Sequence, residues 1–178
     1  MSRNMRMILL ALLLLPAVAI AQPKPAAKQP AKPAAANAPK PLGKFDDWQA
    51  ATFNEGGQTV CYAFTRARTS TPAVQGRGEV LLTVTHRQAA RDAVSIGAGF
   101  AYATGATVSV QADAVTMEFY TAQRSAFSRD GKTSVAAFNK AAAALVKSPG
   151  PKGTVTDSFS LKGFSAAYAA MGKACPAK

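Results

Sequence analysis

The sequence is poor in the side chains that build most active sites. It contains one histidine and two cysteines among 178 residues. A structural zinc site takes four Cys or His ligands, and a Ser-His-Asp or Cys-His nucleophile needs a histidine beside it. His86 is therefore the only residue that could serve as such a base, and its place on the apolar face of an alternating segment favours a structural role. We expect no catalytic residues, no metal ligands and no cofactor.

Short motifs for catalysis and cofactor binding are incomplete as well. Gly163 to Ala167 reads G-F-S-A-A and lacks the second glycine of a serine-hydrolase elbow. Gly97-Ala98-Gly99 lacks the third glycine of a dinucleotide-binding loop. Asp46-Asp47 could touch a calcium ion, but no D-x-D-x-D-G loop follows. These absences predict a protein that is not an enzyme, and a hydrolase on a β scaffold with His86 as its base is the least favoured alternative.

Apolar runs of membrane-spanning length are missing too. Met7 to Ile20 is apolar and follows Arg3 and Arg6, but a spanning helix needs roughly 20 such residues. Ala19-Ile20-Ala21 fits the small-x-small rule for signal peptidase, which predicts cleavage between Ala21 and Gln22. Glutamine in place of cysteine at position 22 excludes a lipid-modified N-terminus. We expect residues 1–21 to be a signal peptide and the mature protein to be periplasmic, secreted or at the cell surface, and not integral to the membrane. An uncleaved anchor is the alternative.

Acidic residues are scarce, and the charge is uneven. Against 21 Lys and Arg stand 9 Asp and Glu, for a net charge of +12. Residues 22–44 read QPKPAAKQPAKPAAANAPKPLGK, where prolines interrupt any helix, so we expect an extended Pro/Ala/Lys-rich tether. This tether favours contact with an anionic polymer, although a basic tail that serves solubility alone fits equally well. Export argues against nucleic acid as the partner.

Residues 45–178 show the period of a β protein. Residues 79–87 alternate, with Val80, Leu82, Val84 and His86 on one face. Other strands are expected at residues 47–53, 58–66, 93–96, 106–111, 115–121, 143–147 and 154–161. A short helix capped by Thr133 or Ser134 is expected through Lys140, and a second helix from Phe164 to Ala174. This pattern predicts a mainly β fold: an antiparallel β-sandwich or barrel-like domain with one short internal helix and a C-terminal helix.

Two groups of side chains in these strands admit more than one interpretation. Tyr62, Phe64, Arg66 and Arg68 share one face and could form a stacking platform for bases or sugars. A core tyrosine and phenylalanine with arginines at the strand end is the favoured interpretation. Asp157 lies in phase with apolar neighbours, so it is either buried and paired or, as we favour, at a strand edge.

The two cysteines that follow the leader, Cys61 and Cys175, predict a disulfide. An even count in an exported chain favours a bridge over free thiols, and no C-x-x-C redox motif is present. Cys175 falls on the apolar stripe of the expected C-terminal helix, where a bridge to the sheet is sterically reasonable.

Four short stretches together resemble a known family. They are F-D-D-W at 45–48, V-C-Y-A at 60–63, T-D-S-F-S-L-K-G-F at 156–164 and G-K-A-C-P at 172–176. In this order and spacing they are similar to the invasion-associated locus B family over Phe45 to Cys175. Many members of the family have a cysteine soon after the tryptophan, whereas Gln49 to Phe53 has none, so only the Cys61–Cys175 bridge is supported.

The resemblance implies an exported periplasmic or envelope protein of alphaproteobacteria with a β-sandwich-type fold and no catalytic residues. Some relatives are tied to entry into host cells, and others occur in free-living bacteria. The leading hypothesis is therefore an exported, non-enzymatic periplasmic, envelope or surface protein that binds an envelope or host-surface ligand. The alternative is a structural envelope factor whose basic tether holds anionic cell-wall or lipopolysaccharide groups.

Overall fold

The computed structural model describes residues 38–177. The strands are β1 Lys40–Phe45, β2 Trp48–Glu55, β3 Gln58–Arg66, β4 Thr69–Thr71, β5 Leu81–His86, β6 Ala93–Gly97, β7 Thr107–Ala112, β8 Val115–Ala122, β9 Ser125–Ser128, β10 Ala143–Gly150 and β11 Gly153–Ser160. The helices are α1 Gly131–Phe138 and α2 Phe164–Ala174. The expected signal peptide, its cleavage site at Ala21 and Gln22, and most of the expected tether lie outside the described residues.

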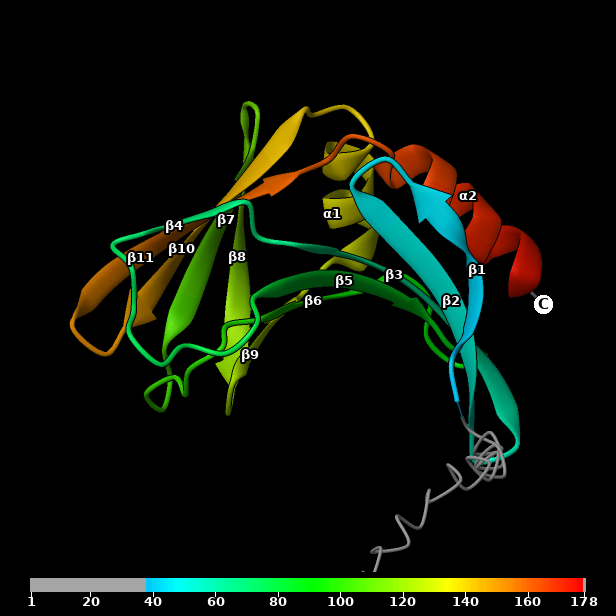
Figure 1. The fold of residues 1–178 in the computed structure, drawn as a ribbon, viewed down its shortest axis with the longest axis horizontal. Helices are drawn as coiled ribbons and strands as arrows, with labels where there is room; N and C mark the ends of the chain where they lie inside the picture. Colours follow the sequence, from blue (N-terminus) through cyan, green and yellow to red (C-terminus); the bar gives the residue numbers. More distant parts are fainter. Residues whose placement is uncertain (1–37, 178) are drawn as a thin grey trace, which may run out of the picture. The chain divides into compact units, whose positions relative to one another are not determined.

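All the described strands belong to one antiparallel sheet, in the order β1-β2-β3-β5-β6-β9-β8-β7-β10-β11-β4. A sheet of this width curls because each strand is rotated against the next. The curl brings β11 beside the chain that leaves β3, where the Arg68 amide donates to the Ser158 carbonyl at 2.7 Å. The strongly bent sheet is visible in Figure 1. The expected fold class, a mainly β antiparallel sandwich or barrel-like domain with two helices, is confirmed, and its strands form one continuous sheet.

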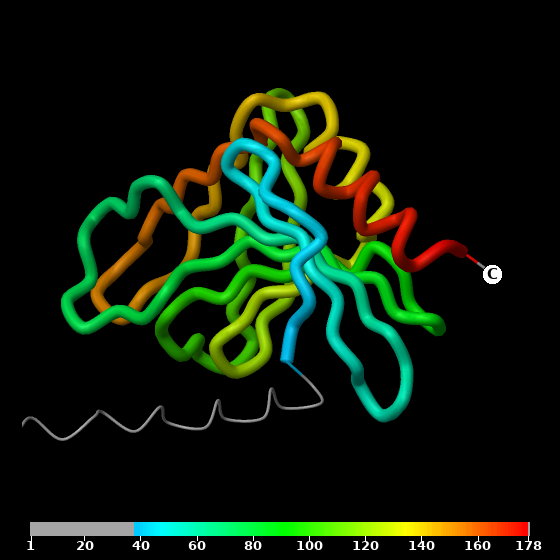
Figure 2. The backbone as a smooth tube through the Cα atoms, turned by 45° about the vertical axis from the view of Figure 1, so that its right-hand side comes forward, coloured from blue at the N-terminus to red at the C-terminus, as the bar shows by residue number. Residues whose placement is uncertain are grey.

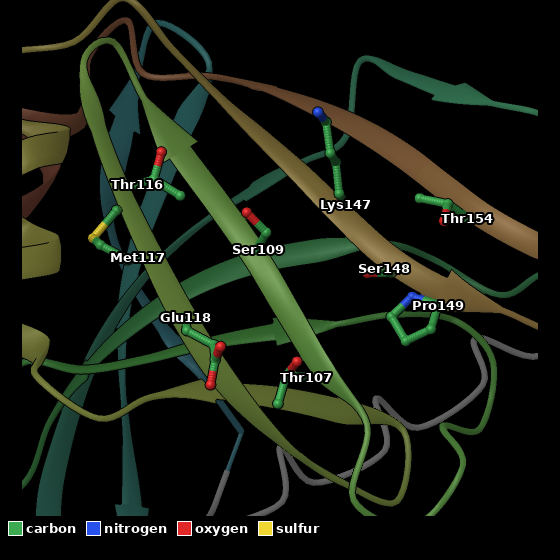
Figure 3. A pocket seen from close by; sticks show the side chains of 9 residues that line it. All are labelled: Thr107, Ser109, Thr116, Met117, Glu118, Lys147, Ser148, Pro149 and Thr154. Carbon is green, nitrogen blue, oxygen red and sulfur yellow. The ribbon is translucent and has the colours of Figure 1, made fainter.

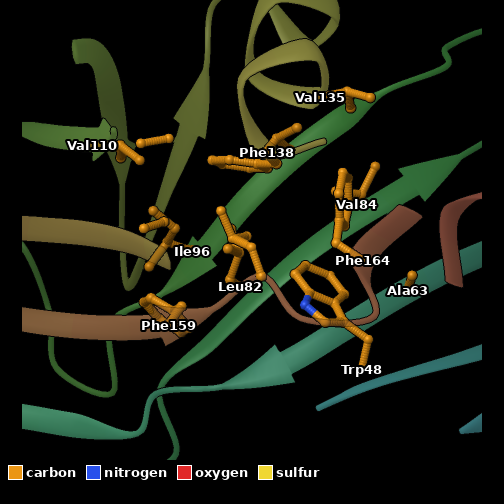
Figure 4. Close-up of a cluster of buried hydrophobic side chains, with 14 of the residues drawn as sticks. Trp48, Ala63, Leu82, Val84, Ile96, Val110, Val135, Phe138, Phe159 and Phe164 are labelled. Atoms are coloured by element: carbon orange, nitrogen blue, oxygen red, sulfur yellow. The ribbon is translucent and has the colours of Figure 1, made fainter. Parts of the chain in front are cut away.

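Alternation along the strands builds the main apolar core. Leu82 and Val84 of β5 are fully buried, as are Ile96 of β6 and Phe159 of β11. Figure 4 shows these side chains gathered with Trp48 in a single cluster. The sequence predicted the buried face of β5 correctly, because a period of two is a local property of the chain.

Helix α2 covers one end of the sheet. Its Phe164, Ala167 and Met171 are fully buried against β1, β2, β3 and β5. The Phe164 ring lies 4.8 Å from that of Trp48, centroid to centroid. Gly163 begins the helix with a φ of 88°, and a Cβ there would collide with the Phe45 carbonyl oxygen. Only glycine therefore fits at position 163 of the K-G-F motif. Figures 1 and 2 show the helix running beside the N-terminal strands to the C-terminus.

The folded region begins earlier than predicted. The expected tether ended at Lys44, but β1 starts at Lys40 and pairs with β2 from Lys40 opposite Thr52 to Phe45 opposite Trp48. Composition alone suggested an unstructured segment. An edge strand tolerates Pro41, because one side of the strand needs no partner for its amide groups, and a register shift between Pro41 and Gly43 accommodates it.

Three local predictions also need correction. Helix α1 begins at Gly131, capped by Asp130, whose carboxylate accepts from the Thr133 amide at 3.1 Å, so neither Thr133 nor Ser134 is the cap. Strand β9 was missed because four residues between two turns carry no readable period. The β10–β11 hairpin extends beyond the expected Lys147, with Pro149 paired to Thr154 and the turn at Pro151 and Lys152.

Candidate functional site

His86 is buried in a network that holds the end of α2 to the sheet. Its side chain is fully buried on the core face of β5, directly opposite Cys61 of β3. The Arg91 guanidinium donates to Nδ1 at 2.8 Å, since arginine has no acceptor. The proton of the neutral ring is therefore on Nε2, which donates to Asp92 Oδ1 at 3.0 Å. Both ring nitrogens are occupied, and no substrate could reach them.

Tyr168 of α2 completes this network. Its hydroxyl donates to Asp92 Oδ1 at 2.7 Å, and its ring meets that of His86 edge-on at 5.2 Å. Burial raises the pKa of Tyr168 to about 12, helped by the Asp92 carboxylate. Burial also lowers the pKa of His86, the Arg91 charge lowers it further, and Asp92 opposes both. The His86–Asp92 contact is thus a hydrogen bond donated by a neutral ring to the carboxylate, rather than an ion pair.

The neutral state of His86 makes the stability of the domain depend on pH. Its folded pKa lies below the unfolded value of 6.5, so the unfolded chain binds more protons and the free energy of unfolding falls as the pH drops below 6.5. Hydrogen bonds lower the pKa of Asp47 and of Asp130 from 3.8, and that of Glu55 from 4.5. Protonation of these carboxylates therefore reduces the free energy of unfolding only at lower pH than the titration of His86.

We predict that chemical denaturation gives a smaller free energy of unfolding at pH 5 than at pH 7. His86→Asn is less stable at pH 7, because it disrupts the network, but loses less between the two values because it has no ring to titrate. An unchanged loss in His86→Asn would assign the pH dependence to other groups.

Asp157 is fully buried and paired, so its expected position at a strand edge is wrong. Arg77 donates to both carboxylate oxygens, at 2.7 and 2.8 Å, and Ser70 donates at 2.6 Å. Arg77 also donates to the Ala98 carbonyl at 2.7 Å. These bonds fasten the loop after β4 to the β10–β11 hairpin, and the two segments lie side by side in Figure 2. The cluster is closed and structural.

The favoured interpretation of the arginine and aromatic group on β3, with Tyr62 and Phe64 in the core, is wrong. Tyr62, Phe64 and Arg66 share the outer face of β3, whereas its core face carries Cys61 and Ala63. Phe64 is stacked on Tyr62 at 5.9 Å and lies under Arg66 at 5.6 Å. The Phe64 ring thus packs against neighbours of its own strand.

The acidic pair at the start of the domain is also used internally. Asp46 pairs with Lys162 at 3.2 Å, and Asp47 pairs with Arg68 at 2.6 Å. Within residues 38–177, no three His, Cys, Asp or Glu side chains gather in a way that could hold a metal ion.

A polar groove on the outer face of the sheet is the better candidate for ligand binding. It has a volume of about 500 Å3 and crosses β7, β8, β10 and β11. Its lining residues are Thr107, Ser109, Thr116, Met117, Glu118, Lys147, Ser148, Pro149 and Thr154. In Figure 3 several of these side chains project from one side of the strands. The groove is large enough for a small ligand or for part of a polymer.

Strand register arranges the polar groups of this groove. Ser109 of β7 lies directly between Glu118 of β8 and Lys147 of β10. Both charged side chains are exposed, and within the described residues neither forms an ion pair. Serine and threonine hydroxyls both donate and accept hydrogen bonds. The groove can therefore bind a ligand rich in hydroxyl, amide or charged groups.

Sequence reasoning missed this groove because its residues come from four strands. The only local signal was the run of threonine and serine at every second position of the outer faces, such as Thr107 and Ser109, or Thr154 and Thr156. Such alternation is the ordinary pattern of a solvent-facing strand, so it did not indicate a site.

The disulfide expected from the sequence is present. Cys61 of β3 is joined to Cys175, immediately after α2, with a Cα–Cα distance of 6.0 Å. Arg91 donates to the Cys175 carbonyl at 2.6 Å, so the bridge and the His86 network fasten the same end of the helix.

Comparison with known proteins places the chain in a family. The model of the Invasion associated locus B (IalB) protein family matches residues 48–172. The chain belongs to this family, as the resemblance of its short motifs had indicated.

A solved structure shares the fold. The crystal structure of invasion associated protein b from Bartonella henselae is similar at 15% identity, with a TM-score of 0.50, and the match covers 74% of this chain and 95% of that one. Likeness at this identity establishes the fold alone. No curated protein matches the chain. Among residues 38–177, no helix is long and apolar enough to cross a membrane.

Proposed function

We propose that this protein is an exported, non-enzymatic component of the bacterial envelope or cell surface, and that it binds its ligand in the groove across β7, β8, β10 and β11. The observation that carries the proposal is the set of outward hydroxyls flanked by Glu118 and Lys147. Family membership, the predicted leader and the disulfide support export.

A binding role is favoured over catalysis by the state of His86. Both of its nitrogens are engaged and its side chain is fully buried, and Cys61 is held in a disulfide. The histidine is thus a structural residue. The name of the Bartonella henselae protein suggests contact with a host cell as one setting in which a surface ligand would be met.

The groove is tested with purified cell-wall sacculi and purified lipopolysaccharide as probes. Ser109→Trp fills its centre without touching the core, because Ser109 lies on the outer face of β7. We expect saturable co-sedimentation of the protein with at least one probe, weakened about tenfold or more in Ser109→Trp. The probe should be recovered with unchanged mass.

A matched control places the same bulk elsewhere on the sheet. Thr85→Trp adds a tryptophan to the outer face of β5, away from the groove, and should bind like the unmodified protein. Equal weakening by both substitutions, or none by Ser109→Trp, would show that the groove is not the binding site. Cleavage of a probe would contradict a non-enzymatic role.

A second candidate function is that of a structural factor that holds anionic envelope polymers through its basic N-terminal segment. The five lysines at positions 24, 28, 32, 40 and 44 favour it. Because Lys40 and Lys44 belong to β1, a deletion that spares the fold must end at residue 39.

Deletion of residues 22–39 separates the two candidates. If the segment holds the polymer, the deletion and a variant with glutamine at positions 24, 28 and 32 should both lose retention on sacculi or lipopolysaccharide at physiological salt. The glutamine variant keeps the length and removes only charge. Unchanged retention in both would contradict this second function and leave the groove as the binding site.

A further inference from the structure

A second, smaller pocket lies at the opposite end of the sheet, beside the disulfide. It has a volume of about 150 Å3, enough for a tetrahedral oxyanion and a few waters. Its lining residues are Thr59, Arg87, Gln88, Arg91, Cys175, Pro176 and Ala177. None of the residues that line this arginine pocket is acidic, and of its two arginines only Arg87 forms an ion pair among the described residues, with Glu55.

The guanidinium of Arg91 is held in place from within the protein. One of its terminal nitrogens donates to His86 Nδ1 at 2.8 Å, and the other donates to the Cys175 carbonyl at 2.6 Å. A guanidinium carries five N–H groups, so most of its donors are not used by these two bonds. Neither partner is an anion, and the charge of Arg91 is therefore not neutralised by them.

Arg87 is positioned from the other side. Its Nε donates to Glu55 at 2.7 Å and one terminal nitrogen donates at 3.2 Å, which leaves its other terminal nitrogen without a partner in these bonds. The ion pair is exposed, so it orients the arginine at little energetic cost or gain. Two oriented guanidiniums, the Gln88 amide and the Thr59 hydroxyl supply the donors that bind an oxyanion well.

We propose that the arginine pocket binds the phosphate or sulfate group of an anionic ligand. This inference goes beyond the function proposed for the groove and does not depend on it, because the two sites share no residue. An oxyanion here would lie between the end of β5, the start of β3 and the chain after α2.

The test is a titration of the protein with sodium sulfate at constant pH, with the ionic strength held fixed with sodium chloride. Calorimetry or amide chemical shifts should show one saturable site, with the largest shifts at residues 87–91 and 175–177. Gln88→Glu places a carboxylate in the pocket at an exposed position and should abolish binding. Arg87→Gln should weaken it about tenfold.

Arg66→Gln is the matched control. Arg66 is an exposed arginine paired with Glu79 at 2.7 Å, much as Arg87 is paired with Glu55, but it lies at the other end of β3. It should leave sulfate binding unchanged, as should the groove variant Ser109→Trp. Equal effects of Arg66→Gln and Arg87→Gln, or shifts that sodium chloride reproduces, would overturn the proposal.

Two competitors identify the source of the anion. Displacement of sulfate by inorganic phosphate indicates a soluble ligand. Displacement by vesicles of phosphatidate and phosphatidylcholine, but not by phosphatidylcholine vesicles alone, indicates a group borne by a membrane. Failure of both competitors to displace sulfate would overturn the assignment to phosphate chemistry.

Discussion

Replacing Cys61 with serine lowers the free energy of unfolding by about 4 kcal/mol. The bridge joins residues 114 apart in sequence, and closing a loop of this length restricts the unfolded chain strongly. The protein should lose more than about 10 °C in Tm, measured by calorimetry with and without a reductant.

The double variant Cys61→Ser/Cys175→Ser is the control. Once the loop is open, removing the second thiol costs little more, so the double and single variants should unfold at nearly the same temperature. A loss of less than about 1 kcal/mol in the single variant would show that the bridge contributes little to stability, because packing of α2 alone would hold the helix.

Replacing Arg77 with methionine is expected to cost about 3–5 kcal/mol. The change leaves Asp157 as a charge with 0% exposed side-chain surface and no cation beside it. Ser70 remains as its hydrogen-bond donor but cannot supply charge. Chemical denaturation should show a lower denaturant concentration at the midpoint of unfolding. The loop after β4, which Arg77 joins to Asp157, should be less ordered.

Two control variants test whether the loss of stability comes from leaving a buried Asp157 unpaired, rather than from the removal of any arginine. Arg66→Met removes an exposed partner of Glu79 and should cost less than about 1 kcal/mol. Arg77→Met/Asp157→Leu replaces both buried partners with apolar groups and should recover much of the loss. If Arg77→Met is as mild as Arg66→Met, the buried ion pair does not hold the loop.

Features with a local period could be predicted from the sequence. The buried face of β5 and the stripe of α2 from Phe164 to Met171 follow from spacings of two and of three to four residues. The disulfide followed from cysteine count and export. Each of these needs only neighbouring residues or a single possible pairing.

Features that depend on distant partners could not be predicted. Asp157 was misjudged because Arg77 lies 80 residues away, and no local pattern marks the pair. The groove and the arginine pocket are each assembled from several strands or from a strand and the C-terminal segment. Sheet order and register bring the residues of each site together, so no single stretch of sequence indicates either the groove or the arginine pocket.

The motifs that carry the family resemblance have structural roles. Trp48 is fully buried and its indole donates to the Ser160 carbonyl at 3.0 Å. Cys61 forms the bridge, Gly163 permits the close approach to Phe45, and Phe164 packs on Trp48. These residues specify the fold. Under the function proposed for the groove, ligand choice would depend instead on outward side chains such as Ser109 and Lys147, which can vary without cost to the core.

Export underlies every role proposed for this chain, because an oxidising compartment favours the disulfide and an envelope ligand is met only outside the cytoplasm. The most direct test is cell fractionation followed by intact-mass analysis before and after reduction. We predict a mass that begins at Gln22, is found in the periplasmic or extracellular fraction, and gains two hydrogens on reduction. A mass that retains Met1, stays with the inner membrane and shows free thiols without reduction would contradict export, cleavage and the bridge together.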